Sequence, residues 1–511
     1  MSPRLNAITV VAIAALVAGC DPRHRRTPDD TLVVVLQDKA ITVDPRFTLS
    51  NYDAAVSKLV AVGLTTVSTT TAEPELALAE RIDTIDPLTI DITLADRRFS
   101  DGTPVTADDV ARTYQTVADP RCDSLYGQIF RDRWKLVEAI DPRHVRMHLA
   151  QPLGTILSDI EFSIISFHGV PPGACQPPVV VGAGPYVLRE LTPYVARFDA
   201  NIYAIPRPRL PHLELRFVTD ASARILMLVG GSADLLENAV RADLVDEVAQ
   251  RDRVHVATEH SLVLTYMLLN NDDPSLKDLR VREAIALALD RPAVIHARFA
   301  GRAVLATGLL PPTHWAYNAD VAHWDRDLPR ARALLDAAGF RAGPDGIRMR
   351  LTYKTSADAF RVAIAHVLAA QLAEVGIAVE VRPFEFATFF ADIKHGNFQI
   401  ATMQTTPITE PDFYFAYFHS SRIPTDADRD AQNRWHYRNG DFDRVAAAAR
   451  HELDRDVRRG YYAEAQRLVA RDLPVIPLWH EDNVVLSNVD VQSYAILPDG
   501  RFAGLPDVAK L

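Results

Sequence analysis

The chain has 511 residues, of which 48% are hydrophobic, 24% charged and 8% aromatic. The length is enough for about three domains, and the composition is typical of a globular protein rather than a disordered chain or a protein with many membrane spans. Lysine and arginine number 55 and aspartate and glutamate 66, so the net charge is −11. Because no long basic run is present, we expect no nucleic-acid partner.

The chain starts with a positively charged residue, Arg4, and a run of small and apolar residues at 7–19. This run is shorter than the about 20 residues that a helix needs to span a bilayer. It ends in Leu-Val-Ala-Gly before Cys20, which resembles the lipobox of bacterial lipoproteins. The resemblance implies that residues 1–19 are a signal peptide and that Cys20 carries the lipid. The alternative is an ordinary secretory leader with an incidental cysteine.

Residues 20–30 contain three arginines, two prolines and almost no apolar side chain. This composition predicts a tether between an anchor and a folded body. Two or three acyl chains hold a protein stably at a membrane, whereas a single chain anchors it only marginally. Asp21 resembles the retention signal of some Gram-negative lipoproteins, which implies a periplasmic protein held at the inner membrane.

Besides Cys20, the chain has two cysteines, Cys122 and Cys175. In an oxidising compartment they could pair, and two buried free thiols are the alternative, because sequence separation says nothing about distance in space. The cysteines lack the close spacing of a zinc site, and His144 and His148 fall in an alternating segment that predicts a strand. We therefore expect no metal and no cofactor.

The first predicted elements of the folded body are two strands and a helix. Residues 31–36 form a continuous, valine-rich apolar run, which predicts a buried strand. Between Leu88 and Leu94, apolar residues alternate with polar ones, as in a half-buried strand. Thr106 then stands three residues before Asp109, a capping-box arrangement that predicts the start of a helix.

Strands and helices continue to alternate along the chain. Helices are predicted up to Gly230, at 276–290 and at 362–375, and strands at 234–236 and 377–381. Residues 473–479 are apolar but contain two prolines, which predicts an edge or bulged strand. This alternation predicts an α/β chain with more than one sheet.

Six short segments carry turn, glycine-proline-tyrosine and paired-arginine motifs in a fixed order, at 77–80, 99–110, 182–188, 278–291, 331–340 and 433–448. Together they resemble the extracytoplasmic solute-binding proteins of family 5, the peptide and nickel type of ABC importer component. The match spans essentially everything after residue 30. It implies an α/β, two-lobed periplasmic-binding-protein fold of type II, large cluster, with an extra subdomain in lobe I.

The resemblance also implies the domain boundaries. Lobe I is expected at 31–262 with a subdomain inserted at about 57–180, lobe II at 263–480, and a return to lobe I at 481–511. The crossings between the lobes are expected near 261–270 and near 479–485, with the ligand between the lobes. Closure signals occupancy only if the ligand's contacts are stronger in the closed state.

By the same resemblance, we expect the substrate-binding component of an ABC importer, which captures a peptide-like or other small solute and delivers it to permease subunits with a separate ATPase. We also expect a monomer. We expect no catalysis, because the sequence has no GxSxG, HExxH or GxxxxGK[ST] motif. The alternatives are an envelope sensor or scaffold with the same fold, and a lipid-anchored hydrolase.

Peptide-binding members of the family hold the ligand's ammonium group with an acidic residue three positions before an acidic-proline pair. Here the pair is Glu410-Pro411, and the matching position is Pro407. Proline neither accepts a charge-assisted hydrogen bond nor balances a buried cation. The sequence thus argues against ordinary recognition of a peptide amino terminus and leaves a sugar, an opine-like solute, a modified peptide or another amphiphilic molecule open.

Candidate ligand contacts are polar residues in loops that leave strand ends in the resembling family. One group follows the first predicted strand, one follows a later strand, and one lies on the altered loop around Pro407. The candidates are Gln37, Asp38 and Lys39; Lys354, Thr355 and Ser356; and Met403, Gln404, Thr405, Thr406 and Glu410.

Overall fold

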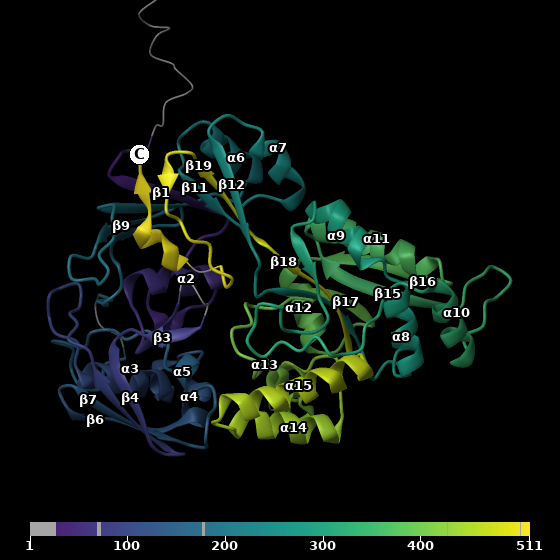
Figure 1. Ribbon diagram of the computed structural model, residues 1–511, viewed down its shortest axis with the longest axis horizontal. Helices are drawn as coiled ribbons and strands as arrows, with labels where there is room; N and C mark the ends of the chain where they lie inside the picture. Colours follow the sequence, from purple (N-terminus) through teal and green to yellow (C-terminus); the bar gives the residue numbers. More distant parts are fainter. Residues whose placement is uncertain (1–26, 69–72, 176–178, 427, 501) are drawn as a thin grey trace, which may run out of the picture.

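The computed structural model describes residues 27–68, 73–175, 179–426, 428–500 and 502–511. Within these residues the strands form sheets of seven, six and four strands and two small two-stranded sheets, with helices on the faces of the larger ones (Figure 1). We call the half with the seven- and four-stranded sheets lobe I and the half with the six-stranded sheet lobe II. The predicted signal peptide, Cys20 and Asp21 lie outside the described residues.

The largest sheet forms the main part of lobe I, in the order β12-β19-β11-β1-β10-β9-β8. Strand β1 lies in its middle, parallel to β10 and β11, and its burial confirms the strand that the valine-rich run predicts. The strands are β1 (Thr31–Leu36), β8 (Tyr186–Leu191), β9 (Val195–Ala200), β10 (His212–Phe217), β11 (Leu235–Glu237), β12 (Val254–Glu259) and β19 (Asn483–Asn488). The helices of this part are η1 (Pro45–Phe47), α2 (Asn51–Val60), α6 (Ala221–Val229), η3 (Ala242–Leu244), α7 (Val245–Ala249) and η5 (Phe502–Asp507), and β20 (Val491–Gln492) pairs with β21 (Ala509–Lys510).

The four-stranded sheet of lobe I is antiparallel, in the order β4-β5-β7-β6. Helix α3 packs against it and starts at Thr106 with the capping box that the sequence predicts. The elements are β2 (Thr65–Val67), β3 (Pro74–Leu76), β4 (Ala79–Asp86), β5 (Thr89–Leu94), α3 (Ala107–Ala118), η2 (Pro120–Cys122), α4 (Gly127–Arg133), β6 (Trp134–Asp141), β7 (His144–Leu149) and α5 (Ile156–Asp159). Cys122 forms a disulfide bond with Cys175, so the paired alternative is the one observed.

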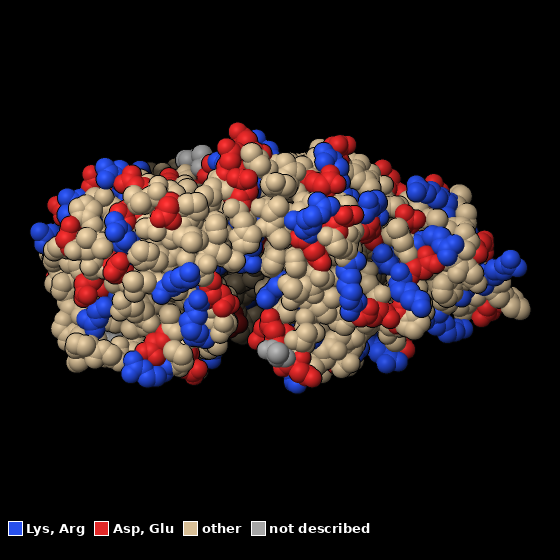
Figure 2. Space-filling model, turned by 90° about the horizontal axis from the view of Figure 1, so that it is seen from below, with Lys and Arg blue, Asp and Glu red and all other residues tan. Residues whose placement is uncertain are grey.

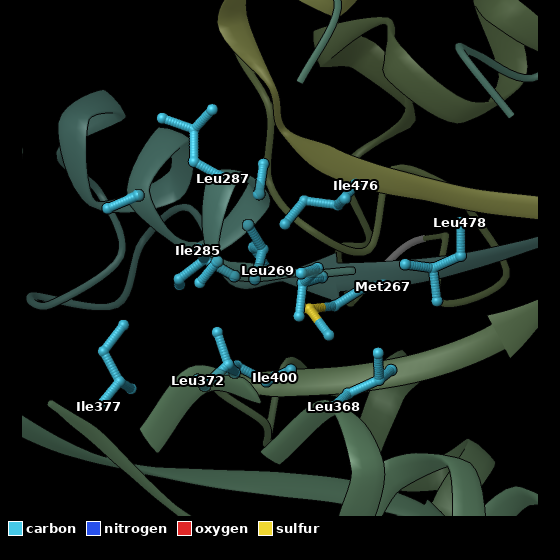
Figure 3. Packing of buried hydrophobic residues seen from close by; sticks show 14 of the residues in the cluster. Met267, Leu269, Ile285, Leu287, Leu368, Leu372, Ile377, Ile400, Ile476 and Leu478 are labelled. Carbon is cyan, nitrogen blue, oxygen red and sulfur yellow. The ribbon is translucent and has the colours of Figure 1, made fainter. Parts of the chain in front are cut away.

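The six-stranded sheet of lobe II has the order β14-β18-β13-β17-β15-β16. Helices α8 to α11 cover one face and α12 to α15 the other, and Figure 3 shows the apolar packing of the first face around Met267, Ile285 and Leu368. The strands are β13 (Leu264–Leu269), β14 (Ala303–Leu305), β15 (Met349–Ser356), β16 (Ile377–Phe384), β17 (Ile400–Gln404) and β18 (Val475–Glu481). The helices are α8 (Leu279–Ala288), α9 (Arg291–Phe299), α10 (Leu328–Ala337), α11 (Ala359–Ala373), α12 (Phe386–Lys394), α13 (Phe413–Phe418), η4 (Ser420–Arg422), α14 (Gly440–His451) and α15 (Arg455–Asp472).

Two predicted elements differ in detail from the observed ones. The helix expected at 276–290 is shorter, because the carboxylate of Asp278 caps the start of α8 and Asp290 caps α9. Strand β18 lies between β14 and β13 and is therefore not an edge strand. Its register with β13 shifts between Thr265 and Tyr266, where Pro477 stands opposite Tyr266, so the bulged alternative is correct.

The disulfide generates a stability prediction. Replacing Cys122 and Cys175 by serine should lower the free energy of unfolding by about 4 kcal/mol, because the bond closes a long loop in the unfolded chain. Urea unfolding of the full chain in detergent measures this change. A reductant should lower the urea midpoint of the native protein but not that of the double variant. Equal urea midpoints for the native protein and the double variant without reductant would contradict the prediction.

Candidate functional site

A cleft of about 850 Å³ lies between the two lobes. Figure 2 views the molecule from below and shows this hollow between its left and right halves. Lobe I contributes α2 and the loop after β11 to the lining of the cleft, and lobe II contributes the loop after β17 and the start of α11. Residues 481–484, where β18 passes into β19, also line it. The volume is within the range of small-ligand sites, about 300–1,000 Å³.

Four of the predicted contacts, Gln37, Gln404, Thr405 and Thr406, line the cleft. Gln37 directly follows β1 and interacts with Tyr52 of α2, where it acts against the rise in the Tyr52 pKa that burial causes. The hydroxyl oxygen Oγ1 of Thr405 accepts a hydrogen bond of 2.9 Å from the backbone N–H of Leu264, which ties this loop to β13. The contact of these residues with a ligand stays a prediction.

The next three predicted contacts are Lys354, Thr355 and Ser356, and none of them lines the cleft. Strand β15 extends to Ser356, so all three are strand residues rather than loop residues. Lys354 forms an ion pair of 2.6 Å with Asp392. Thr355 is only 1% exposed.

The remaining candidates also lie away from the lining. Asp38 and Lys39 come after Gln37, and Asp38 accepts a hydrogen bond from the Lys39 backbone N–H. Met403 packs on the hydrophobic core of lobe II, as strand alternation dictates for the residue before Gln404. Of the three predicted groups, the one after β1 and the one after β17 have members that line the cleft, and the one at 354–356 has none.

Glu410, the last predicted ligand contact, joins the two lobes instead. Its Oε1 atom accepts a hydrogen bond of 2.6 Å from Ser158 Oγ in lobe I, and its Oε2 atom accepts one of 2.9 Å from Arg458 in lobe II. Burial raises the pKa of the Glu410 carboxyl to about 7, although the positive charge of Arg458 acts in the opposite direction. Both carboxylate oxygens are therefore engaged within the protein.

An ion pair that the sequence analysis missed lies on the lobe II side of the cleft. Arg361 of α11 donates a hydrogen bond of 2.8 Å to Glu481 at the end of β18, and Thr265 Oγ1 donates another of 2.7 Å to the same carboxylate. Burial alone would raise the pKa of Glu481, but the charge of Arg361 holds it below the usual value. An acidic residue at the end of an otherwise apolar strand is the signal that could have identified this pair.

Arg224 of α6 lines the lobe I side of the cleft and is held by backbone carbonyl groups. Its Nε atom donates to the carbonyl oxygen of Ala239 at 2.6 Å, and its Nη1 atom donates to those of Val218 and Thr219, both at 2.8 Å. Burial lowers the pKa of this guanidinium. These bonds fix the position of a positive charge at the wall of the cleft.

The cleft also has a buried acid and several aromatic side chains. Tyr494 donates a hydrogen bond to Glu237 at the end of β11, and burial raises the pKa of Glu237 to about 8. This carboxyl is therefore mostly protonated at neutral pH. The aromatic residues that line the cleft are Tyr52, Phe299, Phe360, Phe413 and Phe502.

Pro407 lines the cleft as well. The position that carries the ammonium-binding acid in the resembling family therefore faces the ligand space in this chain but offers no charge and no side-chain acceptor there. The loop presents neutral polar groups from Gln404, Thr405 and Thr406 instead. Neutral hydrogen bonds and apolar surface are what this wall can offer a ligand.

The chain is similar to known proteins over most of its length. Residues 73–425 match the model of the bacterial extracellular solute-binding proteins, family 5. A probable di/tripeptide-binding protein 5 of Pseudomonas aeruginosa is 28% identical over 63% of this chain, and the aligned part spans 60% of that relative. The probable D,D-dipeptide-binding periplasmic protein DdpA of Escherichia coli is 24% identical over 93% of each chain.

Solved structures show the same fold. The ABC transporter substrate-binding protein CtaP of Listeria monocytogenes has a TM-score of 0.84 at 22% identity, over 95% of this chain and 100% of that one. NikZ of Campylobacter jejuni, in complex with Ni(L-His), has a TM-score of 0.81 at 23% identity with the same coverage. At these identities the likeness shows the two-lobed architecture alone.

Proposed function

Because the chain belongs to the bacterial extracellular solute-binding proteins of family 5, we propose that it captures a small solute between its lobes and delivers it to an ABC importer in the periplasm. The observation that supports this most directly is the cleft of about 850 Å³ with walls from both lobes. A ligand there contacts both walls at once only when the lobes are close together. Its binding energy therefore favours closure.

The importer's permease and ATPase are separate partners in this proposal, and the chain itself does no chemistry on the solute. Moving a population from 1% to 99% closed requires about 5.5 kcal/mol of differential affinity for the closed state. A ligand that displaces water from both aromatic and polar walls can supply an amount of this size.

We propose a peptide-like or other small solute as the ligand, with Gln37, Gln404, Thr405 and Thr406 among its contacts. The names of the two relatives support a peptide-like molecule. Pro407 argues for a ligand whose amino group is absent, modified or held elsewhere, because no carboxylate stands at that position to balance a cation.

A ligand screen tests the proposal directly. The full chain, purified in detergent, should gain about 2.7 kcal/mol of stability with one solute at a hundredfold excess over its Kd. Differential scanning fluorimetry with di- and oligopeptides, N-acetylated peptides, sugars and opines measures the shift. If no solute raises the melting temperature while a chromogenic ester or amide is hydrolysed, the protein is an enzyme and the proposal is wrong.

The role of Pro407 generates a gain-of-function prediction. Pro407→Asp should tighten the binding of unmodified dipeptides by about 2 kcal/mol, the strength of a hydrogen bond to a charged group. Pro407→Asn is the matched neutral control and should give no such gain. Isothermal titration calorimetry measures both. Equal gains for a dipeptide and its N-acetylated form would contradict an interaction with the amino group.

We also propose that Cys20 anchors the protein to a membrane through lipid, with Asp21 favouring the inner membrane. Among the helices in the described part of the chain, none is both long enough and apolar enough to cross a bilayer. Cys20→Ser should release the protein from the membrane fraction or leave its leader uncleaved. Fractionation and the mass of the mature chain check this outcome, and a membrane-bound, normally processed Cys20→Ser protein would disprove the anchor.

A further inference from the structure

The lobes meet a second time, at the end of the cleft away from the crossings. There α5 and the loop before it, in lobe I, face α14 and α15 of lobe II (Figure 1). The backbone N–H of Gly154 donates to the carbonyl oxygen of Arg450 at 3.2 Å, and Glu73 forms an ion pair of 2.5 Å with Arg455. His451 Nδ1 lies 3.0 Å from the carbonyl oxygen of Pro152.

Glu410 lies at the centre of this contact and connects side chains of both lobes. Ser158 Oγ reaches its carboxylate from lobe I at 2.6 Å, and Arg458 reaches it from lobe II at 2.9 Å. The side chain of Glu410 is 16% exposed and that of Arg458 6%. Separating the lobes removes the bond to Ser158 but leaves the ion pair with Arg458 within lobe II.

We propose that Glu410 is a positioning residue for solute capture, which fastens α5 of lobe I to α15 of lobe II and so sets the fraction of molecules whose lobes are closed. The proposal rests on the proposed function, because closure serves capture only if the ligand binds between the lobes. Glu410 is not among the residues that line the cleft, so its effect on capture runs through the position of the lobes.

The contact between Glu410 and Ser158 changes the affinity for a ligand although neither residue contacts the ligand. When only a fraction of the molecules is competent to bind, the apparent Kd is the intrinsic Kd divided by that fraction. A contact at the far end of the cleft that favours closure therefore tightens the binding of every solute by the same factor. Loss of the contact weakens binding by that factor.

Hydrogen exchange tests the proposal without a ligand, because the amide of Gly154 is bonded across the interface. In the full chain, Ser158→Ala and Glu410→Ala should each accelerate exchange of the peptide that contains Gly154 by at least fivefold. The double variant should exchange no faster than Glu410→Ala, since both substitutions remove the same bond. Glu464→Gln is the control, because Glu464 lies on the same helix α15 and pairs with Arg467 inside lobe II.

The outcomes distinguish a Glu410 that connects the two lobes from a Glu410 that only stabilises lobe II. If Glu410→Ala accelerates exchange but Ser158→Ala leaves it unchanged, Glu410 acts through Arg458 alone and the proposal is wrong. Unchanged exchange in both variants also overturns it. A negative ligand screen would defeat the proposed function but leave the exchange result intact, so the two failures are distinguishable.

The pH dependence of the same amide gives a readout that a purely structural role would not move. The groups that interact with Glu410 are Ser158 and Asp159 of α5, Asp412 before α13, and Arg458 and Tyr462 of α15. Arg133 at the end of α4 and Arg450 of α14 interact with Asp412 in turn. Burial raises the pKa of Glu410 to about 7 and that of Asp412 to about 6 in the closed arrangement. Opening removes the part of this burial that lobe I provides, so the pKa of Glu410 falls toward its ordinary value while the ion pair with Arg458 remains.

Closure therefore takes up protons, so the contact is strongest at low pH and weakens as the pH rises through about 7. After correction for intrinsic rates, the Gly154 peptide should exchange several-fold faster at pH 8 than at pH 5.5. Glu410→Gln keeps the shape of the side chain without the charge and should remove most of this dependence, whereas Glu464→Gln should retain it. An unaltered pH profile in Glu410→Gln would overturn the assignment to Glu410.

Discussion

The chain crosses between the lobes twice, from β12 to β13 and from β18 to β19. These two crossings run antiparallel to each other, and we call them the ribbon. In lobe I, β12 pairs with β19 as far as Glu259 opposite Asn483, and in lobe II, β13 pairs with β18 from Leu264 opposite His480. Asp482 alone separates β18 from β19, and its Oδ1 atom lies 2.8 Å from Nδ1 of His260 in the other crossing. Because these two crossings are the backbone connections between the lobes within the described residues, the closure that we propose bends the chain at this ribbon.

Two charged groups beside the ribbon are satisfied inside their own lobe, whereas Arg302 of lobe II forms an ion pair with Asp246 of lobe I. Arg361 is paired with Glu481 in lobe II, and Arg224 is bonded to carbonyl groups of lobe I. Removing one member of such a pair leaves a buried group without its partner, which costs more than the contact itself contributes. These residues therefore shape the walls of the cleft, while the neutral side chains at 404–406 and the aromatic rings remain available to a ligand.

The sequence predicts local features well and long-range partners poorly. The capping box at Thr106 and the buried strand β1 follow from neighbouring residues, so the pattern alone identifies them. At Pro477 the pattern leaves an edge strand or a bulged strand open, and the pairing partners decide between the two. Arg282 shows the limit: it belongs to the paired-arginine motif at 278–291, whose sequence does not reveal that the residue is only 7% exposed and donates to the carbonyl oxygens of Asp472 and Leu473 at the end of α15. Glu410 is a similar case, since nothing near it in the sequence indicates Ser158, which folds against it from the other lobe.

The ribbon and the contact at Glu410 lie at opposite ends of the cleft, and this arrangement separates affinity from selectivity. The free energy of closure is a property of the protein, so a stronger or weaker far contact changes the binding of all solutes by one common factor. In the proposed function, the residues that line the cleft between the two ends contact the solute, and differences in these contacts make one solute bind better than another. Under the two proposals, a change at Pro407 alters which molecule is captured, whereas a change at Glu410 alters how tightly any molecule is held.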